Sequence, residues 1–360
     1  MTSTLTSQGS KPNEASFTKL EDRILGSLSA GVVADALGAP TEQRSIREIR
    51  NLFGGRVETF FAPPADSPYA KGRKAAQYTD DSSQMIMLAE ALVRGGGEIT
   101  PREMADILLT WSQDPQYYPH FAGPSTQRAV EALREGADPA TLGAQGREAT
   151  TGASNGGAMR VAPAGLVNPG NVAGAVRTAA VTCQPSHFTS IGVSGAGAIA
   201  AAVAVALRDD ATVLDVVRAA LEGAELGHEI GATHGREVAG ALVAKRIELA
   251  VHIASTSRTL DQAIEEIAFT VGTGLHTSEA VPAAIGFFVA AAGDPWKAAI
   301  AAANAGDDSD TVGCMSASIA GAYTGSAGVP ADKLSAVLAA NELDLRALAH
   351  GLAEVARARF

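Results

Sequence analysis

This sequence has few cysteines and few aromatic residues, and each shortage excludes a class of protein. Two cysteines, Cys183 and Cys314, are too few among 360 residues for a disulfide framework or a multi-cysteine metal site. Aromatic residues make up 5% of the chain, while Ala and Gly are abundant, which favours closely packed helices over a sheet of aromatic and β-branched residues. We therefore predict two buried thiols in a reducing compartment and an all-α fold.

The chain also lacks the signals of export, membrane insertion and nucleic-acid binding. Residues 1–15 are polar and contain no apolar segment of the kind that a secretory signal needs. The longest apolar stretch, residues 192–207, is mostly Ala, Gly and Val and is too short to span a bilayer. The net charge of -11 repels a phosphate backbone. We predict a cytoplasmic protein with no nucleic-acid or membrane partner, and an acidic domain of this kind is compatible with a monomer.

The sequence does contain a nearly continuous series of helical patterns. Apolar residues recur every three or four positions from Leu20 to Val32, which predicts a helix over residues 17–37. Residues 53–78 are rich in Gly, Pro and aromatic residues, which predicts a long ordered loop, and such loops are uncommon unless they are functional. Further helices are expected at residues 84–93, 101–111, 125–135, 192–207, 213–226, 234–253, 260–271, 280–292, 296–303, 311–324 and 344–358.

No repeat, linker or alternating strand pattern divides the chain. The predicted organisation is a disordered N-terminal tail over residues 1–16 and one compact all-helical domain over residues 17–360.

Two clusters of acidic and hydroxyl residues each precede a predicted helix. Residues 78–83 read Tyr-Thr-Asp-Asp-Ser-Ser, and residues 306–311 read Gly-Asp-Asp-Ser-Asp-Thr. Helix capping explains part of each cluster, because Asp81 with Gln84 has the spacing of a capping box and either Asp310 or Thr311 is suited to cap the later helix. A cap needs only one carboxylate, however, and each cluster has at least two, whose mutual repulsion a cation would relieve.

The ligand types in these clusters narrow the choice of metal. Carboxylate and hydroxyl oxygens without Cys or adjacent His suit Mg²⁺, Mn²⁺ or Ca²⁺ and argue against zinc. Asp308 and Asp310 are two positions apart and would point in different directions on a helix, so we expect them on a turn. With Thr79, Asp80 and Asp81 opposite, there are enough oxygens for two ions about 4 Å apart.

Five segments, in this order, resemble the ADP-ribosylglycohydrolase family, which includes the glycohydrolases that activate dinitrogenase reductase. They are residues 31–42 (GVVADALGAPTE), 79–82 (TDDS), 155–163 (NGGAMRVAP), 278–284 (SEAVPAA) and 308–313 (DSDTVG). The resemblance implies a single orthogonal bundle of helices with a binuclear Mg²⁺ centre in a central cleft, and Mn²⁺ fits the same ligands.

The resemblance also implies roles for individual residues. The ligands of the two ions would be Thr79, Asp80, Asp81, Asp308, Asp310 and Thr311. Glu42, Asp80 and Asp310 would form the catalytic set. Glu42 matches a glutamate that lies beside the metals in some members, where it would act as a general base or stabilise a cationic transition state; the alternative is a solvated loop acid. For Asp35, within a helical pattern, we expect a structural role such as a cap.

A second group of residues is expected to bind the substrate. The paired glycines of residues 155–160 let backbone N–H groups approach a ligand, and the family uses this loop against ribose and diphosphate; a plain tight turn is the alternative. Residues 123–126 are a second candidate phosphate loop at a helix start. The predicted substrate-binding residues are Phe121, Gly123, Ser125, Asn155, Gly156, Gly157, Met159 and His187.

The reaction that the resemblance implies is hydrolysis of a ribosyl glycosidic bond, in an ADP-ribosylated protein or an ADP-ribose derivative. Bacterial members that act on ADP-ribosylarginine often have an acid where this chain has Phe121. This difference disfavours an arginine-linked substrate. A serine-linked, O-acyl-linked or free-nucleotide substrate fits as well, as does a small ribosyl compound or nucleoside whose base stacks on Phe121.

Two other classes of protein share some of these features. Helical prenyl and terpene synthases also use Mg²⁺ and aspartate-rich motifs, but their pattern needs a third acid after two intervening residues, and here Ser82, Ser83 and Gln84 follow Asp81. A non-enzymatic member that binds ADP-ribose or serves a structural role, as the lens crystallins of this family do, would be expected to lose metal ligands. All six candidate ligands are present in this chain, which favours catalysis.

Overall fold

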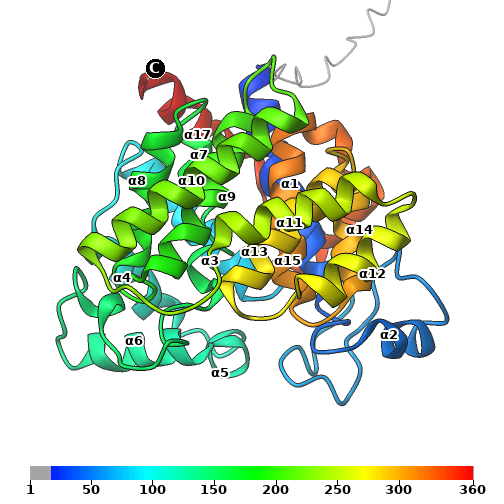
Figure 1. The fold of residues 1–360 in the computed structure, drawn as a ribbon, viewed down its shortest axis with the longest axis horizontal. Helices are drawn as coiled ribbons and strands as arrows, with labels where there is room; N and C mark the ends of the chain where they lie inside the picture. The colour runs from blue at the N-terminus through cyan, green and yellow to red at the C-terminus, as the bar shows by residue number, and fades with distance from the viewer. Residues whose placement is uncertain (1–17, 360) are drawn as a thin grey trace, which may run out of the picture.

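The structure is a computed structural model that describes residues 18–359, so the tail predicted over residues 1–16 lies outside the described residues. Within this range the chain forms seventeen α-helices, three short 3₁₀ turns and two isolated β-bridges, with no β-strand (Figure 1). The all-α prediction is confirmed. The helices are α1 (Lys19–Gly38), α2 (Ile46–Leu52), α3 (Asp80–Arg94), α4 (Pro101–Trp111), α5 (Tyr118–Phe121), α6 (Pro124–Arg134), α7 (Ala162–Leu166), α8 (Val172–Cys183), α9 (Ser190–Ala206), α10 (Val213–His234), α11 (Val243–Thr256), α12 (Leu260–Thr270), α13 (Thr277–Ala290), α14 (Pro295–Ala305), α15 (Ser309–Thr324), α16 (Ala331–Ala340) and α17 (Arg346–Arg359).

Several predicted helix boundaries were wrong. Helix α3 begins at Asp80 rather than near Gln84, and α15 begins at Ser309 rather than Thr311. The acids of both clusters therefore lie largely in first helical turns and not on the loops before them. The helix predicted over residues 234–253 is also wrong, because α10 continues to its end at His234 and α11 starts only at Val243. Helices α2, α5, α7, α8 and α16 were not predicted.

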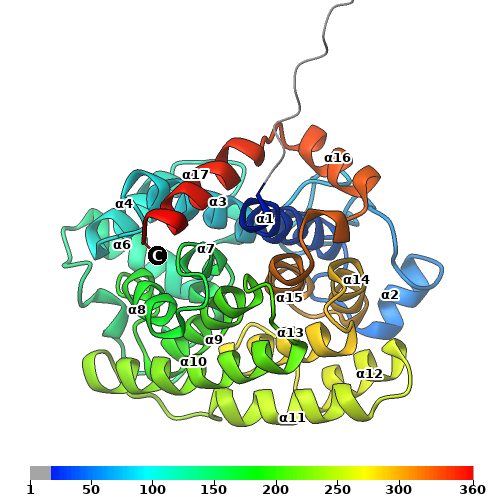
Figure 2. The ribbon, with the colours of Figure 1, turned by 90° about the horizontal axis from the view of Figure 1, so that it is seen from above.

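Two almost wholly buried helices organise the packing. Helix α1 lies against α14, α15 and α17, and α9 lies against α7, α8 and α10 (Figure 2). All residues of α9 are buried. Its small side chains permit close approach: a Cβ on Gly197 would lie 2.5 Å from the carbonyl oxygen of Gly223 in α10, and the reverse distance is 2.4 Å. This chain buries its core by bringing backbones together, which explains how few aromatic residues it needs.

No helix among residues 18–359 combines the length and the apolar character that crossing a bilayer would require.

Candidate metal centre and ligand cleft

The acidic clusters meet where the end of α1 touches the start of α15. Gly38, the last residue of α1, leaves no room for a side chain, because a Cβ there would lie 2.5 Å from the backbone nitrogen of Asp310. The hydroxyls of Thr41 and Ser309 are 3.0 Å apart, and Ser309 also donates to the carbonyl of Gly38 at 3.0 Å. These contacts hold the first turn of α15 against the end of α1.

Backbone pairing brings Glu42 to the same place. The N–H of Gln43 donates to the carbonyl of Asp307 at 2.6 Å, and the N–H of Asp307 donates to the carbonyl of Arg44 at 3.0 Å. The segment after α1 is therefore tied to the turn that precedes Asp308. Glu42 is buried there, so it is not the solvated loop acid that was the alternative.

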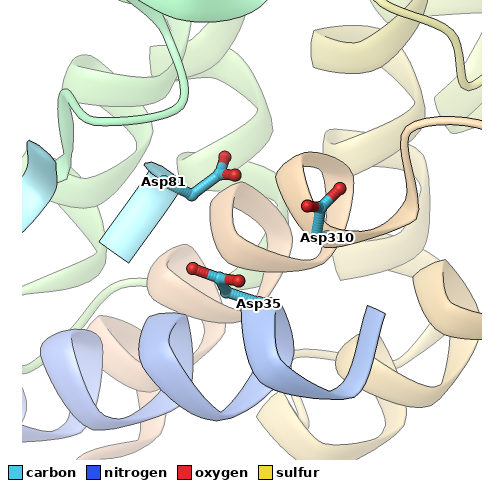
Figure 3. Close-up of side chains that lie close together, drawn as sticks. All are labelled: Asp35, Asp81 and Asp310. Carbon is cyan, nitrogen blue, oxygen red and sulfur yellow. The ribbon is translucent and has the colours of Figure 1, made fainter. Parts of the chain in front are cut away.

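The buried carboxylates form two adjoining groups. Asp35, Asp81 and Asp310 come from three different helices, and one oxygen of each lies within 4.8 Å of the others (Figure 3). Glu42, Asp308 and Asp310 meet the same criterion. Asp310 belongs to both groups, so the two sets of oxygens are contiguous.

Asp35 accounts for the capping of α3. Its Oδ1 accepts from the N–H and the hydroxyl of Thr79, both at 2.8 Å. Its Oδ2 accepts from the N–H of Ser82 at 2.9 Å and from the hydroxyl of Ser82 at 2.5 Å. The first turn of α3 is thus satisfied by a side chain from α1, in agreement with the structural role expected for Asp35. Asp80 and Asp81 are therefore not needed to cap α3.

Burial and mutual repulsion raise the pKa of every acid in the cluster. Burial, followed by the charges of Asp310 and Asp308, raises the pKa of Glu42 well above its ordinary value. The pKa values of Asp80, Asp81 and Asp310 are also raised well above the ordinary value, first by burial and then by neighbouring carboxylates. Burial raises the pKa of Asp308 to about 6, against an opposing hydrogen bond from Asn155.

The donor set fits a hard divalent cation. Glu42 Oε2 and Asp81 Oδ1 are buried and have no hydrogen-bond partner among the described residues. Leaving carboxylate oxygens unpartnered in the interior costs free energy unless a positive charge compensates them. The candidate ligand atoms of the cluster are all oxygens, which Mg²⁺, Mn²⁺ and Ca²⁺ prefer. The residues present therefore fit a metal centre.

A cleft of ≈ 290 Å³ opens over this cluster. Eleven of the residues proposed from the sequence line it, namely Glu42, Asp80, Phe121, Gly123, Asn155, Gly156, Met159, His187, Asp308, Asp310 and Thr311. Thr79 and Asp81 are buried and do not line the cleft. Ser125 lines an adjacent cavity of ≈ 370 Å³ and accepts the N–H of Gly152 at 3.0 Å. Gly157 packs behind the cleft wall, where a Cβ would lie 2.9 Å from the Cys183 sulfur.

Sequence reasoning missed five lining residues and one contact. The five residues that also line the cleft are Tyr69, Ala122, Gln127, Ser154 and Leu275. Tyr69 belongs to the loop over residues 53–78, whose length indicated function without singling out a residue. Asn155, expected to contact substrate, donates its side-chain amide to Asp308, so it also orients an acid of the cluster.

A larger cavity of ≈ 560 Å³ lies between α3 and α4, away from the acidic cluster. Its acids Glu90 and Asp106 are exposed and pair with Arg94 and Arg102. Glu103 is used in the capping box of α4. Because these acids are solvated and already partnered, this cavity offers no comparable chemistry.

Comparisons with known proteins agree with this geometry. The ADP-ribosylglycohydrolase family model matches residues 16–359, and the chain belongs to this family. It is 30% identical over 342 residues to YegU of Escherichia coli (strain K12), an uncharacterized protein, covering 94% of this chain and 98% of that one. It is 26% identical to ADP-ribosylhydrolase ARH3 of Homo sapiens, covering 86% of this chain and 87% of that one.

A solved structure, described as an ADP-ribosylglycohydrolase-related protein complex, shares the fold, with a TM-score of 0.66 and 24% identity. The match covers 94% of this chain and 100% of that one. The family assignment predicted from the five sequence segments is confirmed. The protein is a hydrolase that acts on glycosidic bonds.

Proposed function

We propose that this protein is a Mg²⁺-dependent glycohydrolase that cleaves the ribosyl bond of an ADP-ribosylated protein or an ADP-ribose derivative. The observation that carries the proposal is the pair of adjoining carboxylate groups, sharing Asp310, beneath a cleft of ≈ 290 Å³. Two ions would be held by Thr79, Asp80, Asp81, Asp308, Asp310 and Thr311, and Mn²⁺ would fit the same oxygens. When bound, the ions would orient ribose hydroxyls and an attacking water.

Glu42 is the proposed catalytic carboxylate. It lines the cleft and its Oε2 has no partner among the described residues, so this oxygen is available to a substrate or a water. Cleavage at the anomeric carbon develops positive charge on the ribose ring. A carboxylate at this position would accept the proton of the attacking water or stabilise that charge.

The residues of the cleft wall favour one class of leaving group over another. Phe121 lines the cleft with Tyr69, and the guanidinium of Arg73 lies 5.5 Å from the Phe121 ring. Arg73 itself does not line this cleft, so an arginine leaving group would meet an aromatic ring at the position of Phe121, backed by a guanidinium and without an acid to pair with. We therefore propose a serine-linked or O-acyl-linked ADP-ribosyl substrate in preference to an arginine-linked one.

A hydrolysis panel tests the proposal. ADP-ribosylserine peptide, O-acetyl-ADP-ribose, ADP-ribosylarginine and simple nucleosides would each be incubated with Mg²⁺ or with EDTA, and the products separated by liquid chromatography. We expect Mg²⁺-dependent release from the serine or acyl compound, lost in Asp80→Asn. Asp307→Asn is the matched control, because Asp307 belongs to the same acidic segment as Asp308 but does not line the cleft.

Turnover of nucleosides alone would replace the proposed substrate with a small ribosyl compound. Tight binding of ADP-ribose without turnover of any substrate would indicate a binding protein, and metal-independent turnover would refute the role of the carboxylate groups.

A further inference from the structure

A buried chain of hydrogen bonds runs behind the cleft from α3 to the cleft wall. Arg160 donates from Nη1 to Gln84 Oε1 at 2.6 Å and from Nη2 to Ser186 Oγ at 3.0 Å. Ser186 Oγ lies 2.8 Å from His187 Nδ1, and His187 Nε2 lies 3.0 Å from Ser154 Oγ. Ser154 and His187 line the cleft. This series of hydrogen bonds thus joins the helix that carries Asp80 and Asp81 to the wall of the cleft.

Arg160 is the unusual member of this chain. Its side chain is fully buried, and among the described residues it forms no ion pair with a carboxylate; Asp80 acts on it only as a neighbouring charge. A guanidinium in such a place is costly, because it loses its hydration and no carboxylate replaces it by direct contact. Nothing in the mechanism proposed above uses it. A buried cation that makes no direct ion pair needs a reason other than ion pairing.

The chemistry of a guanidinium gives the chain a direction. Arg160 can only donate, so Ser186 Oγ must accept from it. Among the described residues, the only other side-chain partner of the Ser186 hydroxyl is His187 Nδ1, and a buried hydroxyl hydrogen needs an acceptor. The Ser186 hydroxyl therefore donates to Nδ1. A neutral imidazole that accepts at Nδ1 bears its hydrogen on Nε2.

His187 is held neutral and in place by its surroundings. Its side chain is buried, and burial lowers its pKa well below the ordinary value. Gly156 packs on the ring so closely that a Cβ would lie 2.9 Å from both Cε1 and Nε2. The glycine expected from sequence to admit a ligand therefore also makes room for the imidazole. The ring cannot turn freely to exchange its two nitrogens.

The direction of the chain decides what Ser154 offers to the cleft. If Nε2 bears the hydrogen, it donates to Ser154 Oγ, and the Ser154 hydroxyl hydrogen is left to point to a ligand. If Nδ1 bore the hydrogen, the Ser154 hydroxyl would donate its hydrogen to Nε2 and would present only lone pairs to the ligand. Lone pairs repel a phosphoryl oxygen, whereas a hydroxyl hydrogen binds it.

We propose that Arg160 is a positioning residue that fixes His187 in the tautomer protonated on Nε2 and so makes the Ser154 hydroxyl a hydrogen-bond donor to a phosphoryl oxygen of the ligand. The role assigned to Ser154 rests on the proposed function, because it takes the ligand to be an ADP-ribosyl compound. The tautomer of His187 is a property of the protein without ligand.

The first test is the ¹⁵N spectrum of the histidine side chains in the full-length protein, with His187→Gln to assign the signal. Protonated and unprotonated imidazole nitrogens differ widely in chemical shift. We expect His187 to bear hydrogen on Nε2 alone, and a mixture of tautomers in Arg160→Met and in Ser186→Ala. Ser186→Ala is the milder change and serves if the arginine variant does not fold. Ser194→Ala is the matched control, because this buried serine donates to the Ala224 carbonyl and takes no part in the hydrogen bonds between Arg160 and Ser154.

The second test is calorimetric titration with ADP-ribose. Ser154→Ala should weaken binding at least about tenfold, as expected for a lost hydrogen bond to a charged group, and Ser186→Ala should weaken it by less. Hydrogen on Nδ1 in the unmodified protein, or an unchanged tautomer in both variants, would overturn the role of Arg160. Binding unaffected by Ser154→Ala would overturn the role of Ser154. Failure of the unmodified protein to bind ADP-ribose would instead count against the proposed function, with the tautomer still deciding the role of Arg160.

Discussion

Helices α9 and α15 are both rich in small residues and almost wholly buried, yet only one of them carries a site. Helix α9 begins with a conventional cap, in which the Thr189 side chain accepts the N–H of Gly192 at 3.1 Å. Helix α15 begins at Ser309, its N-cap residue Asp308 makes no side-chain capping hydrogen bond, and Asp310 lies in its first turn. The same packing surface can therefore serve as a scaffold or as a site, depending on its first turn.

The difference between the two helices is one of satisfied and unsatisfied polar groups. In α9, Ser194 donates to a backbone carbonyl at 2.8 Å, so this polar group needs nothing further. At α15, the acids face one another and Glu42, and burial raises the pKa of each. Buried acids that lie close together and repel one another indicate a partner from outside the protein, here a cation. The following predictions separate the two regions experimentally, from the largest expected effect to the smallest.

Replacing the proposed catalytic acid should reduce turnover without loss of stability. For Glu42→Gln we expect kcat to fall by about 10²–10⁴-fold, the range typical of a lost general base. The melting temperature should not fall, because the change removes a buried charge whose Oε2 has no partner among the described residues. Glu58→Gln, at an exposed acid, is the control and should match the unmodified protein. Full turnover in Glu42→Gln with metal bound would withdraw the assignment.

Metal binding at the first turn of α15 should stabilise the protein. At Mg²⁺ concentrations about a hundredfold above Kd, the free energy of unfolding should rise by about 2.7 kcal/mol. Urea unfolding with Mg²⁺ or EDTA would measure the increase. Asp310→Asn should abolish it, because Asp310 belongs to both carboxylate groups. Asp307→Asn should retain it, and an equal response in the two variants would mean that the cation binds elsewhere.

Crowding the contact between α9 and α10 should lower the stability of the protein without changing its turnover. Gly223→Ala places a Cβ 2.4 Å from the carbonyl oxygen of Gly197, so α9 and α10 must separate. We expect the free energy of unfolding to fall by about 1–3 kcal/mol while kcat of the folded protein stays unchanged. Chemical denaturation and steady-state kinetics on one preparation would measure both. Altered kcat at full folding would show that the α9 region is coupled to the site.

The buried imidazole should make a small, pH-dependent contribution. Burial lowers the pKa of His187, so below the ordinary pKa of about 6.5 the unfolded chain binds a proton that the folded protein does not. Stability is therefore lost as pH falls through this value. Between pH values of about 7.5 and 5.5 the unmodified protein should lose about 1 kcal/mol more than His187→Gln. Parallel pH profiles of the two proteins would contradict the lowered pKa.

Local sequence sufficed where local chemistry decides the structure. The low aromatic content and the helical spacing predicted an all-α chain, and α4 was predicted with both of its ends because Pro101 stands in its first turn. The order of five short segments was enough to predict the family. Eight of the cleft-lining residues were also named from those segments, since each motif keeps its residues adjacent in the chain.

Other features depend on residues that only the fold brings together. The start of α3 was misplaced because its cap is Asp35, which precedes Thr79 by 44 positions and belongs to another helix. A buried Arg160 without a carboxylate partner could not be distinguished from a surface arginine in the sequence.

The sequence by itself determined that this chain would be helical, would belong to its family and would bear two acidic clusters. The tertiary structure alone decided that two carboxylate groups meet at Asp310, that Asp35 caps α3 in place of the other acids, and that Arg160 reaches His187 through Ser186. The physical reason is that backbone propensity and motif order act between near neighbours. Burial, repulsion and the direction of a hydrogen bond depend on which distant groups the packing brings within a few ångströms.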